Sequence, residues 1–203
     1  MKKILFSLLL ISSLTFAQTE KKVGDFHKVT TFDQITVELI ASDENKVVLS
    51  GINSDEVEVI NKNGELKLRM PLTNLLKGNQ VKAKVYYIDL DAVEANEGSQ
   101  ISNESILKSV DFEIIAKEGA KINIELEVEK LTVKITSGAI VNTKGIAKNQ
   151  DVLVSAGAIY EGKELITEQT VISSNAGSDI AVHGNPKQIT KKTFAGGHIK
   201  IVK

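Results

Sequence analysis

The peptide VKITSGAIV, from Val133 to Val141, is followed by VLVSAGAIY, from Val152 to Tyr160, and the same pattern runs through residues 93–203. In each unit a small residue follows a glycine, and a β-branched or aromatic residue comes three positions after it. These glycines recur every 19 to 21 residues, at Gly98, Gly119, Gly138, Gly157, Gly177 and Gly196. A period in this range is typical of a solenoid, whose repeats contact only their neighbours.

Apolar and polar residues alternate on both sides of each glycine. In the first quoted unit Val133, Ile135, Ala139 and Val141 fill alternate positions, and Lys134 lies between two of them. A period of two indicates strands with one buried face. We therefore predict an all-β fold, a right-handed parallel β-helix-like solenoid of about 20-residue rungs. The glycines are interpreted as its structural corners, since no unit contains a phosphate-binding glycine motif.

The first seventeen residues have the features of a secretory signal peptide. Lys2 and Lys3 precede an apolar run from Ile4 to Leu14, and small residues stand before Gln18. This run is shorter than the roughly 20 residues that span a bilayer. The sequence thus predicts cleavage after residue 17 and export to the periplasm, the cell surface or the extracellular medium.

Residues 18–88 are rich in strand patterns but lack the glycine repeat. The predicted strands are 35–41, 46–50, 56–60, 65–70 and 80–88. Asn63 and Gly64 predict a tight hairpin, and residues 72–79 a loop or one helical turn. We expect 18–88 to form a β-rich cap on the rungs of 89–203, either as a separate domain or as the first rungs of one solenoid.

Composition narrows the classes of partner. The formal net charge is −1 and Arg69 is the single arginine, so we expect no nucleic-acid partner. The chain has no cysteine, so its stability must come from the core and the stacked backbone rather than from disulfides.

Three segments resemble one known family. They are Phe26 to Leu39, with its ITVEL stretch, the NGELKL stretch of residues 63–68, and the glycine-centred rungs that end in VHGNP (182–186) and GGHI (196–199). In order and spacing these segments resemble the head GIN-domain family of auto-transporter adhesins, exported proteins of Bacteroidetes-type bacteria. The resemblance covers nearly the whole mature chain, which it implies to be one GIN-type domain. It further implies a β-helix-like fold and a role in surface adhesion or glycan binding, and it supplies no catalytic residues.

An enzyme is the weaker hypothesis. Glu125, Glu127 and Glu129 alternate along one predicted strand, where neighbouring carboxylates would lie about 7 Å apart, as in some glycosidases. A solvated outer face explains them more simply. His183 and His198 could meet on adjacent rungs as a weak metal or acid–base pair, but two surface histidines are the preferred interpretation. We predict no catalytic residues, no metal and no cofactor.

Four apolar residues occupy positions that the alternation predicts to face outward: Ile115, Ile140, Leu153 and Ile159. Ile140 and Ile159 both lie two positions after a glycine, so they would stack in one column. They form a candidate partner surface, or else lie under a loop. The hypotheses are a non-catalytic adhesin-like or glycan-binding module of the cell envelope, a structural protein that forms homo-oligomers through this strip, and a degenerate carbohydrate-active enzyme. The expected partner is a glycan or a cell-surface protein.

Overall fold

The computed structural model describes residues 19–183 and 186–202, and the predicted signal peptide and its cleavage site lie outside them. The described residues contain strands and short 3-10 helices. The strands are β1 (Thr19–Lys22), β2 (Lys28–Thr31), β3 (Thr36–Ala41), β4 (Lys46–Gly51), β5 (Glu58–Lys62), β6 (Glu65–Arg69), β7 (Val81–Tyr87), β8 (Ala92–Ala95), β9 (Gln100–Asn103), β10 (Leu107–Ala116), β11 (Lys121–Ile135), β12 (Ile140–Val154), β13 (Ile159–Asn175), β14 (Asp179–His183), β15 (Gln188–Phe194) and β16 (His198–Val202). The 3-10 helices are η1 (Ser54–Glu56), η2 (Leu72–Asn74) and η3 (Gly78–Gln80).

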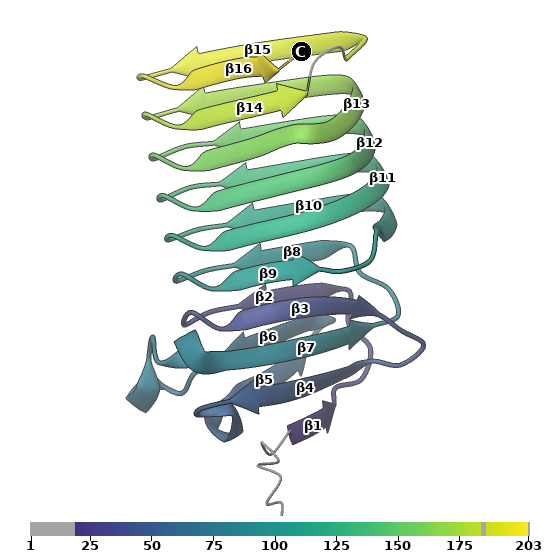
Figure 1. The fold of residues 1–203 in the computed structure, drawn as a ribbon, viewed down its shortest axis with the longest axis vertical. Helices are drawn as coiled ribbons and strands as arrows, with labels where there is room; N and C mark the ends of the chain where they lie inside the picture. Colours follow the sequence, from purple (N-terminus) through teal and green to yellow (C-terminus); the bar gives the residue numbers. More distant parts are fainter. Residues whose placement is uncertain (1–18, 184–185, 203) are drawn as a thin grey trace, which may run out of the picture.

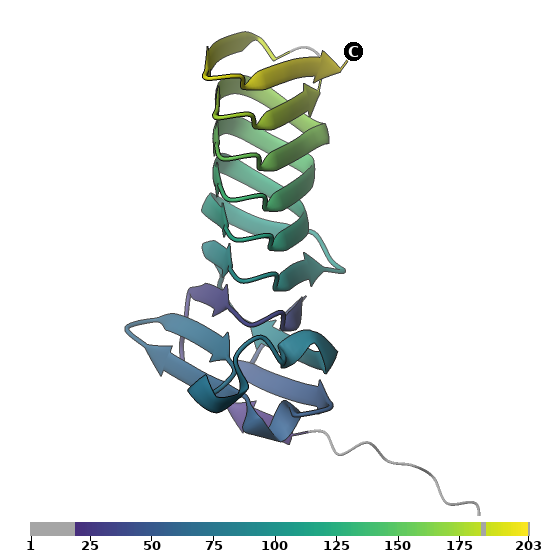
Figure 2. The ribbon, with the colours of Figure 1, turned by 90° about the vertical axis from the view of Figure 1, so that its left-hand side faces the viewer.

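The predicted parallel β-solenoid is confirmed. β10, β11, β12 and β13 pair in parallel, each with the next, and one turn of the chain forms one rung. Each long strand bends halfway, so it contributes one half to each of two faces, and the tight corners lie along the opposite edge (Figure 1). Seen from that edge, the rungs form a narrow stack above a broader N-terminal part (Figure 2).

The glycines form the predicted corners. At the third of these corners Ser137 and Gly138 both have positive φ, 55° and 72°, as in the type I′ turns that join tightly paired strands. The Gly138 N–H donates to the carbonyl of Ala156 in the next corner, 3.1 Å away. A Cβ on Gly138 would meet no atom within 4 Å, so backbone conformation rather than space favours glycine there.

The alternating apolar residues stack as columns inside the solenoid. Ile114, Val133, Val152 and Ile172 are in register on successive rungs, and each is fully buried. The small residues after the glycines, from Ser99 to Ser178, are likewise 0% exposed. The core is therefore one continuous cluster, which each rung extends.

The stacking begins before the glycine repeat. β2 pairs in parallel with β8, and β3 with β9, so residues 28–41 form a rung in register with the later ones. Its corner is formed by Asp33 and Gln34, both with positive φ, and contains no glycine. The next rung outward consists of β6 and β7, which pair in parallel with β2 and β3. The β2–β3 rung thus lies between the β6–β7 rung and the β8–β9 rung, although it precedes both in sequence.

Antiparallel strands cover the N-terminal end. β4 pairs with β7, β1 pairs with β4, and β5 joins β6 through the predicted hairpin turn at Asn63 and Gly64. Where a loop or one helical turn was predicted over residues 72–79, the chain forms two 3-10 helices, η2 and η3, joined by a short connection, and β7 begins one residue later than predicted. None of the helices in the described residues is long and apolar enough to cross a membrane.

Candidate functional site

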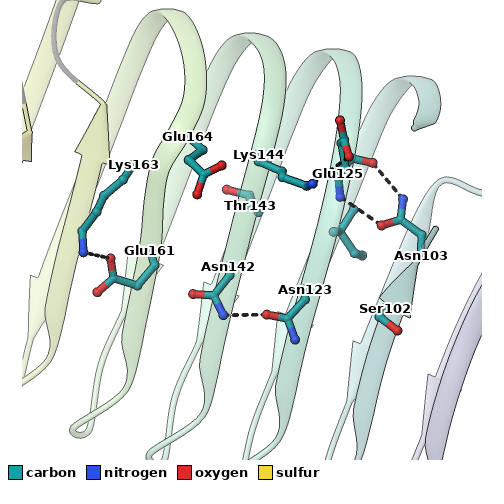
Figure 3. Close-up of a pocket in the computed structure, with 11 residues that line it drawn as sticks. Ser102, Asn103, Asn123, Glu125, Asn142, Thr143, Lys144, Glu161, Lys163 and Glu164 are labelled. Atoms are coloured by element: carbon teal, nitrogen blue, oxygen red, sulfur yellow. Dashed lines mark hydrogen bonds and ion pairs between the residues drawn. The ribbon is translucent and has the colours of Figure 1, made fainter. Parts of the chain in front are cut away.

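A groove of about 580 Å³ crosses four rungs on the face that follows the glycine corners (Figure 3). Its walls come from β9, β11, β12 and β13, and the lining side chains are mostly amides, hydroxyls and charged groups. They are Ser102, Asn103, Asn123, Ile124, Glu125, Asn142, Thr143, Lys144, Glu161, Lys163 and Glu164.

Two glycines shape the strands around this groove. Gly145 has φ +106°, and a Cβ there would lie 2.1 Å from the carbonyl oxygen of Leu126. In β13 an extra residue interrupts the register between the partners of Asn142 and Lys144, which is a β-bulge. Gly162 lies in this bulge, where a Cβ would be 2.7 Å from the Tyr160 ring. The bulge and the close approach at Gly145 make this stretch of the face irregular.

A polar column runs along the groove. Ser102, Asn123, Asn142 and Glu161 are in register on successive strands. The side-chain Nδ2 of Asn142 donates to the side-chain Oδ1 of Asn123 at 2.6 Å (Figure 3). Among the described residues, no side chain forms a hydrogen bond with Nδ2 of Asn123 or with Oδ1 of Asn142. A donor and an acceptor are therefore left for a ligand.

Asn103 closes one end of the groove. Its side-chain Nδ2 donates to the backbone carbonyl oxygen of Glu125 at 2.8 Å, and its Oδ1 accepts from the backbone N–H of Glu125 at 3.0 Å. The side chain thus takes the place of a neighbouring strand at the end of β9. Because both of its polar atoms are engaged, Asn103 positions the groove wall rather than contacting a ligand.

The charges in the groove are largely paired. Lys144 lies 2.9 Å from Glu125, and Lys163 lies 2.7 Å from Glu161. The hydrogen bond to Glu125, together with its negative charge, raises the pKa of Lys144. Glu164 lies in register with Lys144 on the neighbouring strand. The groove thus presents fixed charges of both signs.

A buried hydroxyl cluster lies beneath this surface. The hydroxyls of Thr143 and Tyr160 are 2.6 Å apart, and the Gln150 side chain also donates to the Tyr160 oxygen. Tyr160 is 0% exposed, and burial raises the pKa of its phenol. The Tyr160 ring supports the floor of the groove and cannot stack on a ligand.

The three alternating glutamates are not gathered into an acid–base site. Glu125, Glu127 and Glu129 each pair with a lysine of a neighbouring rung: Lys144 at 2.9 Å, Lys108 at 2.9 Å and Lys148 at 2.5 Å. Their side chains are 32%, 53% and 52% exposed. This pattern is the solvated ionic face that the simpler interpretation expects.

The two histidines do not meet, which corrects the pairing considered from the sequence. His198 pairs with Asp179 at the start of β14, whereas His183 ends that strand and pairs with Val202. Four residues of strand separate their positions, about 13 Å. His198 Nδ1 instead lies 3.3 Å from Asp179 Oδ1. In the part of the chain that the structure describes, no three His, Cys, Asp or Glu side chains gather as a metal site.

The four outward apolar residues fall on two faces. Ile140 and Ile159 pair directly across β12 and β13, and both are half-buried. Ile115 and Leu153 lie on the other face, where Lys134 stands between them in register. The strip of Ile140 and Ile159 therefore exists as a neighbouring pair, and its role as a partner surface stays a prediction.

The asparagines of the groove were not among the site residues predicted from the sequence. A signal was present, because the residue four positions after the glycine is Ser102, Asn123, Asn142 and Glu161 in four consecutive units. An uninterrupted polar column on one face is the pattern that would have identified them. The bulge and the close approach at Gly145 depend on neighbouring rungs and have no comparable signal.

Comparison with known families gives one match. The profile of the family described as "Putative auto-transporter adhesin, head GIN domain" matches residues 25–203. No curated protein matches the chain.

Several solved structures share the fold. A putative adhesin from Bacteroides fragilis is 17% identical with a TM-score of 0.81, and the alignment covers 94% of this chain and 98% of that one. A putative lipid binding protein from Parabacteroides distasonis is 13% identical, with a TM-score of 0.65 and coverage of 92% and 96%. A putative adhesin from Parabacteroides merdae is 13% identical, with a TM-score of 0.61 and coverage of 93% and 96%. At these identities the likeness establishes the fold.

Proposed function

This chain belongs to the head GIN domain family of putative auto-transporter adhesins, and on that premise we propose that it is an exported, non-catalytic adhesion module whose groove binds a glycan. The observation that carries the proposal is the column of Ser102, Asn123, Asn142 and Glu161 along the groove. Sugar hydroxyls both donate and accept hydrogen bonds. The side-chain amides of Asn123 and Asn142 can donate and accept, and the carboxylate of Glu161 accepts.

The rung spacing suits a repeating ligand. Neighbouring strands lie about 4.8 Å apart, so the four positions of the column extend over roughly 14 Å. That length exceeds one sugar ring, and the groups repeat at a distance comparable with one sugar unit. The groove therefore favours an oligosaccharide lying along the solenoid axis over a monosaccharide.

The charges support binding rather than hydrolysis. A general acid at neutral pH needs a raised pKa, which burial or a like charge supplies. Glu125 and Glu161 instead lie beside lysines, at 2.9 Å and 2.7 Å. Both carboxylates are therefore suited to accept hydrogen bonds from sugar hydroxyls.

The test is a glycan array probed with the mature chain, residues 18–203, followed by titration of any hit. We expect Asn123→Ala and Asn142→Ala each to weaken binding about tenfold, the effect of losing one or two good hydrogen bonds. Asn149→Ala is the matched control, because Asn149 is an exposed asparagine of β12 outside the groove. Equal binding by all three variants would remove the groove from the proposal, and an array without signal would remove glycan binding.

The second candidate function is structural, with homo-oligomers formed through Ile140 and Ile159. The direct pairing of these two half-buried side chains favours it. Light scattering would then report a multimer, and Ile140→Lys would convert it to a folded monomer. A wild-type monomer at high concentration would rule this candidate out.

A further inference from the structure

The last rung has open backbone edges. β15 pairs only with β13, and β16 only with β14, among the strands of the described residues. Both lie at the end of the stack opposite the antiparallel cap (Figures 1 and 2). Every residue of β15 is exposed, in contrast to the alternating burial of β11 to β13. Backbone N–H and C=O groups along such an edge are available to another strand.

This end of the molecule is strongly basic. From Gly184 to Lys203 the sequence has five lysines and neither aspartate nor glutamate, although the whole chain has a net charge of −1. Within the described residues no carboxylate lies within ion-pair distance of Lys191, Lys192 or Lys200. Several lysines along the rungs below, such as Lys134 and Lys148, do have such partners, and Lys187, just before β15, pairs with Glu168 at 2.8 Å.

Lys191 occupies a position at which the rungs beneath it have apolar residues. It is in register with Ile172, which continues the buried column of Val133 and Val152. In the last rung this column therefore ends in an ammonium group. Any strand added to the edge of β15 would cover Lys191, and a covered ammonium without an anionic partner is strongly unfavourable.

We propose that the edge of β15 is a docking site for an extended acidic segment of a partner protein, which adds to the solenoid as a further strand. Backbone hydrogen bonds would hold the segment, and a carboxylate on its inward side would pair with Lys191. A second copy of this chain fits poorly, because its own last rung brings more lysines and no carboxylate. An uncharged strand would leave Lys191 unpaired.

Apolar side chains beside the lysines refine the partner. Ile189 is 37% exposed and lies over Thr170, and Phe194 at the other end of β15 is 76% exposed. Ile189 lies two positions from Lys191 on the same face of β15, whereas Phe194 lies on the opposite face. A segment that alternates acidic and apolar residues would therefore place carboxylates over Lys191 and apolar side chains on the face of Phe194. Acidic residues alone would leave Phe194 uncovered.

The probe is a short fluorescent peptide that alternates glutamate and valine, titrated by anisotropy into the mature chain. We expect binding that weakens about tenfold in Lys191→Glu, and less in Lys191→Gln. Lys121→Glu is the matched control, since it makes the same charge change on an exposed lysine of β11. A second peptide, N-methylated at every residue, keeps the charge but has no backbone N–H to donate along either edge, and we expect it not to bind.

Several results would overturn the proposal. They are no binding of the unmodified peptide, equal binding of the N-methylated one, equal loss in Lys121→Glu, and a stable wild-type dimer by light scattering that Lys191→Glu abolishes. Binding to phosphatidylglycerol vesicles through Lys191 without peptide binding would likewise assign the surface to a membrane instead. Failure here leaves glycan binding in the groove untouched, because the two sites share no residue.

Discussion

At the scale of single residues, Asp33 anchors the loop that replaces a corner in the β6–β7 rung. Its carboxylate is 2% exposed and accepts from the N–H groups of Met70 at 2.9 Å and Leu76 at 3.0 Å. We expect Asp33→Ala to lower the free energy of unfolding by about 2 kcal/mol, because the buried Met70 N–H and the partly buried Leu76 N–H both lose their acceptor. Urea denaturation measures this. Asp33→Asn should cost less, since asparagine also tolerates the positive φ of 59°.

Asp55→Ala is the control for that experiment, because Asp55 is an exposed carboxylate in the same N-terminal part. An Asp33→Ala variant as stable as Asp55→Ala would mean that the loop is held by its apolar contacts instead.

Glu94 makes the stability depend on pH. Burial opposes its ionisation, but hydrogen bonds from Lys117 at 2.8 Å and Lys28 at 2.7 Å, with their charges, outweigh burial and lower the pKa of Glu94. A lowered folded-state pKa stabilises the protein above the unfolded value of about 4.3, and that contribution is lost as pH falls through the folded-state pKa. We expect Glu94→Gln to destabilise at pH 7 and the difference from wild type to shrink on acidification.

Denaturant midpoints measured from pH 7 down to pH 3 provide the test. A gap between Glu94→Gln and wild type that stays constant over this range would show that the glutamate contributes through packing alone.

At the scale of the rung elements, the backbone conformation of the corner determines which residue is favoured there. Gly138 has φ +72° and free space around its missing Cβ. We therefore expect Gly138→Val to cost about 2 kcal/mol and Gly138→Asn clearly less, because asparagine enters the left-handed region more readily than a β-branched residue. Thermal unfolding of both variants compares them directly. Equal losses would indicate a steric origin for the glycine column.

The elements also show where sequence reasoning reaches its limit. The glycine corners and inward columns follow from local alternation, which repeats in every unit, so they were predictable. The rung formed by β2 and β3 has no glycine at its corner. Its strand β2 pairs with β6 and β8, and both of these strands are distant from β2 in sequence. No periodic signal marks such pairing. The groove depends on a bulge beside Asn142 and on the contact between Gly145 and Leu126 on the neighbouring rung, so its shape could not be read from one strand.

At the scale of the whole molecule, each rung contacts only its neighbours, so stability is expected to vary along the stack. Val152 is fully buried in the middle rungs, whereas every residue of β15 is exposed. We expect hydrogen exchange to be fastest in β15 and β16 and slowest in β11 to β13.

Val152→Ala should lower the protection of β11 to β13 by about 2 kcal/mol and leave β15 and β16 little changed, because the last rung already opens by itself. Val171→Ala is the control, since Val171 is 41% exposed and lies on the neighbouring strand. If all rungs exchanged at one rate, and Val152→Ala shifted them together, the solenoid would unfold as a single unit. The open edge at β15 would then be as rigid as the core.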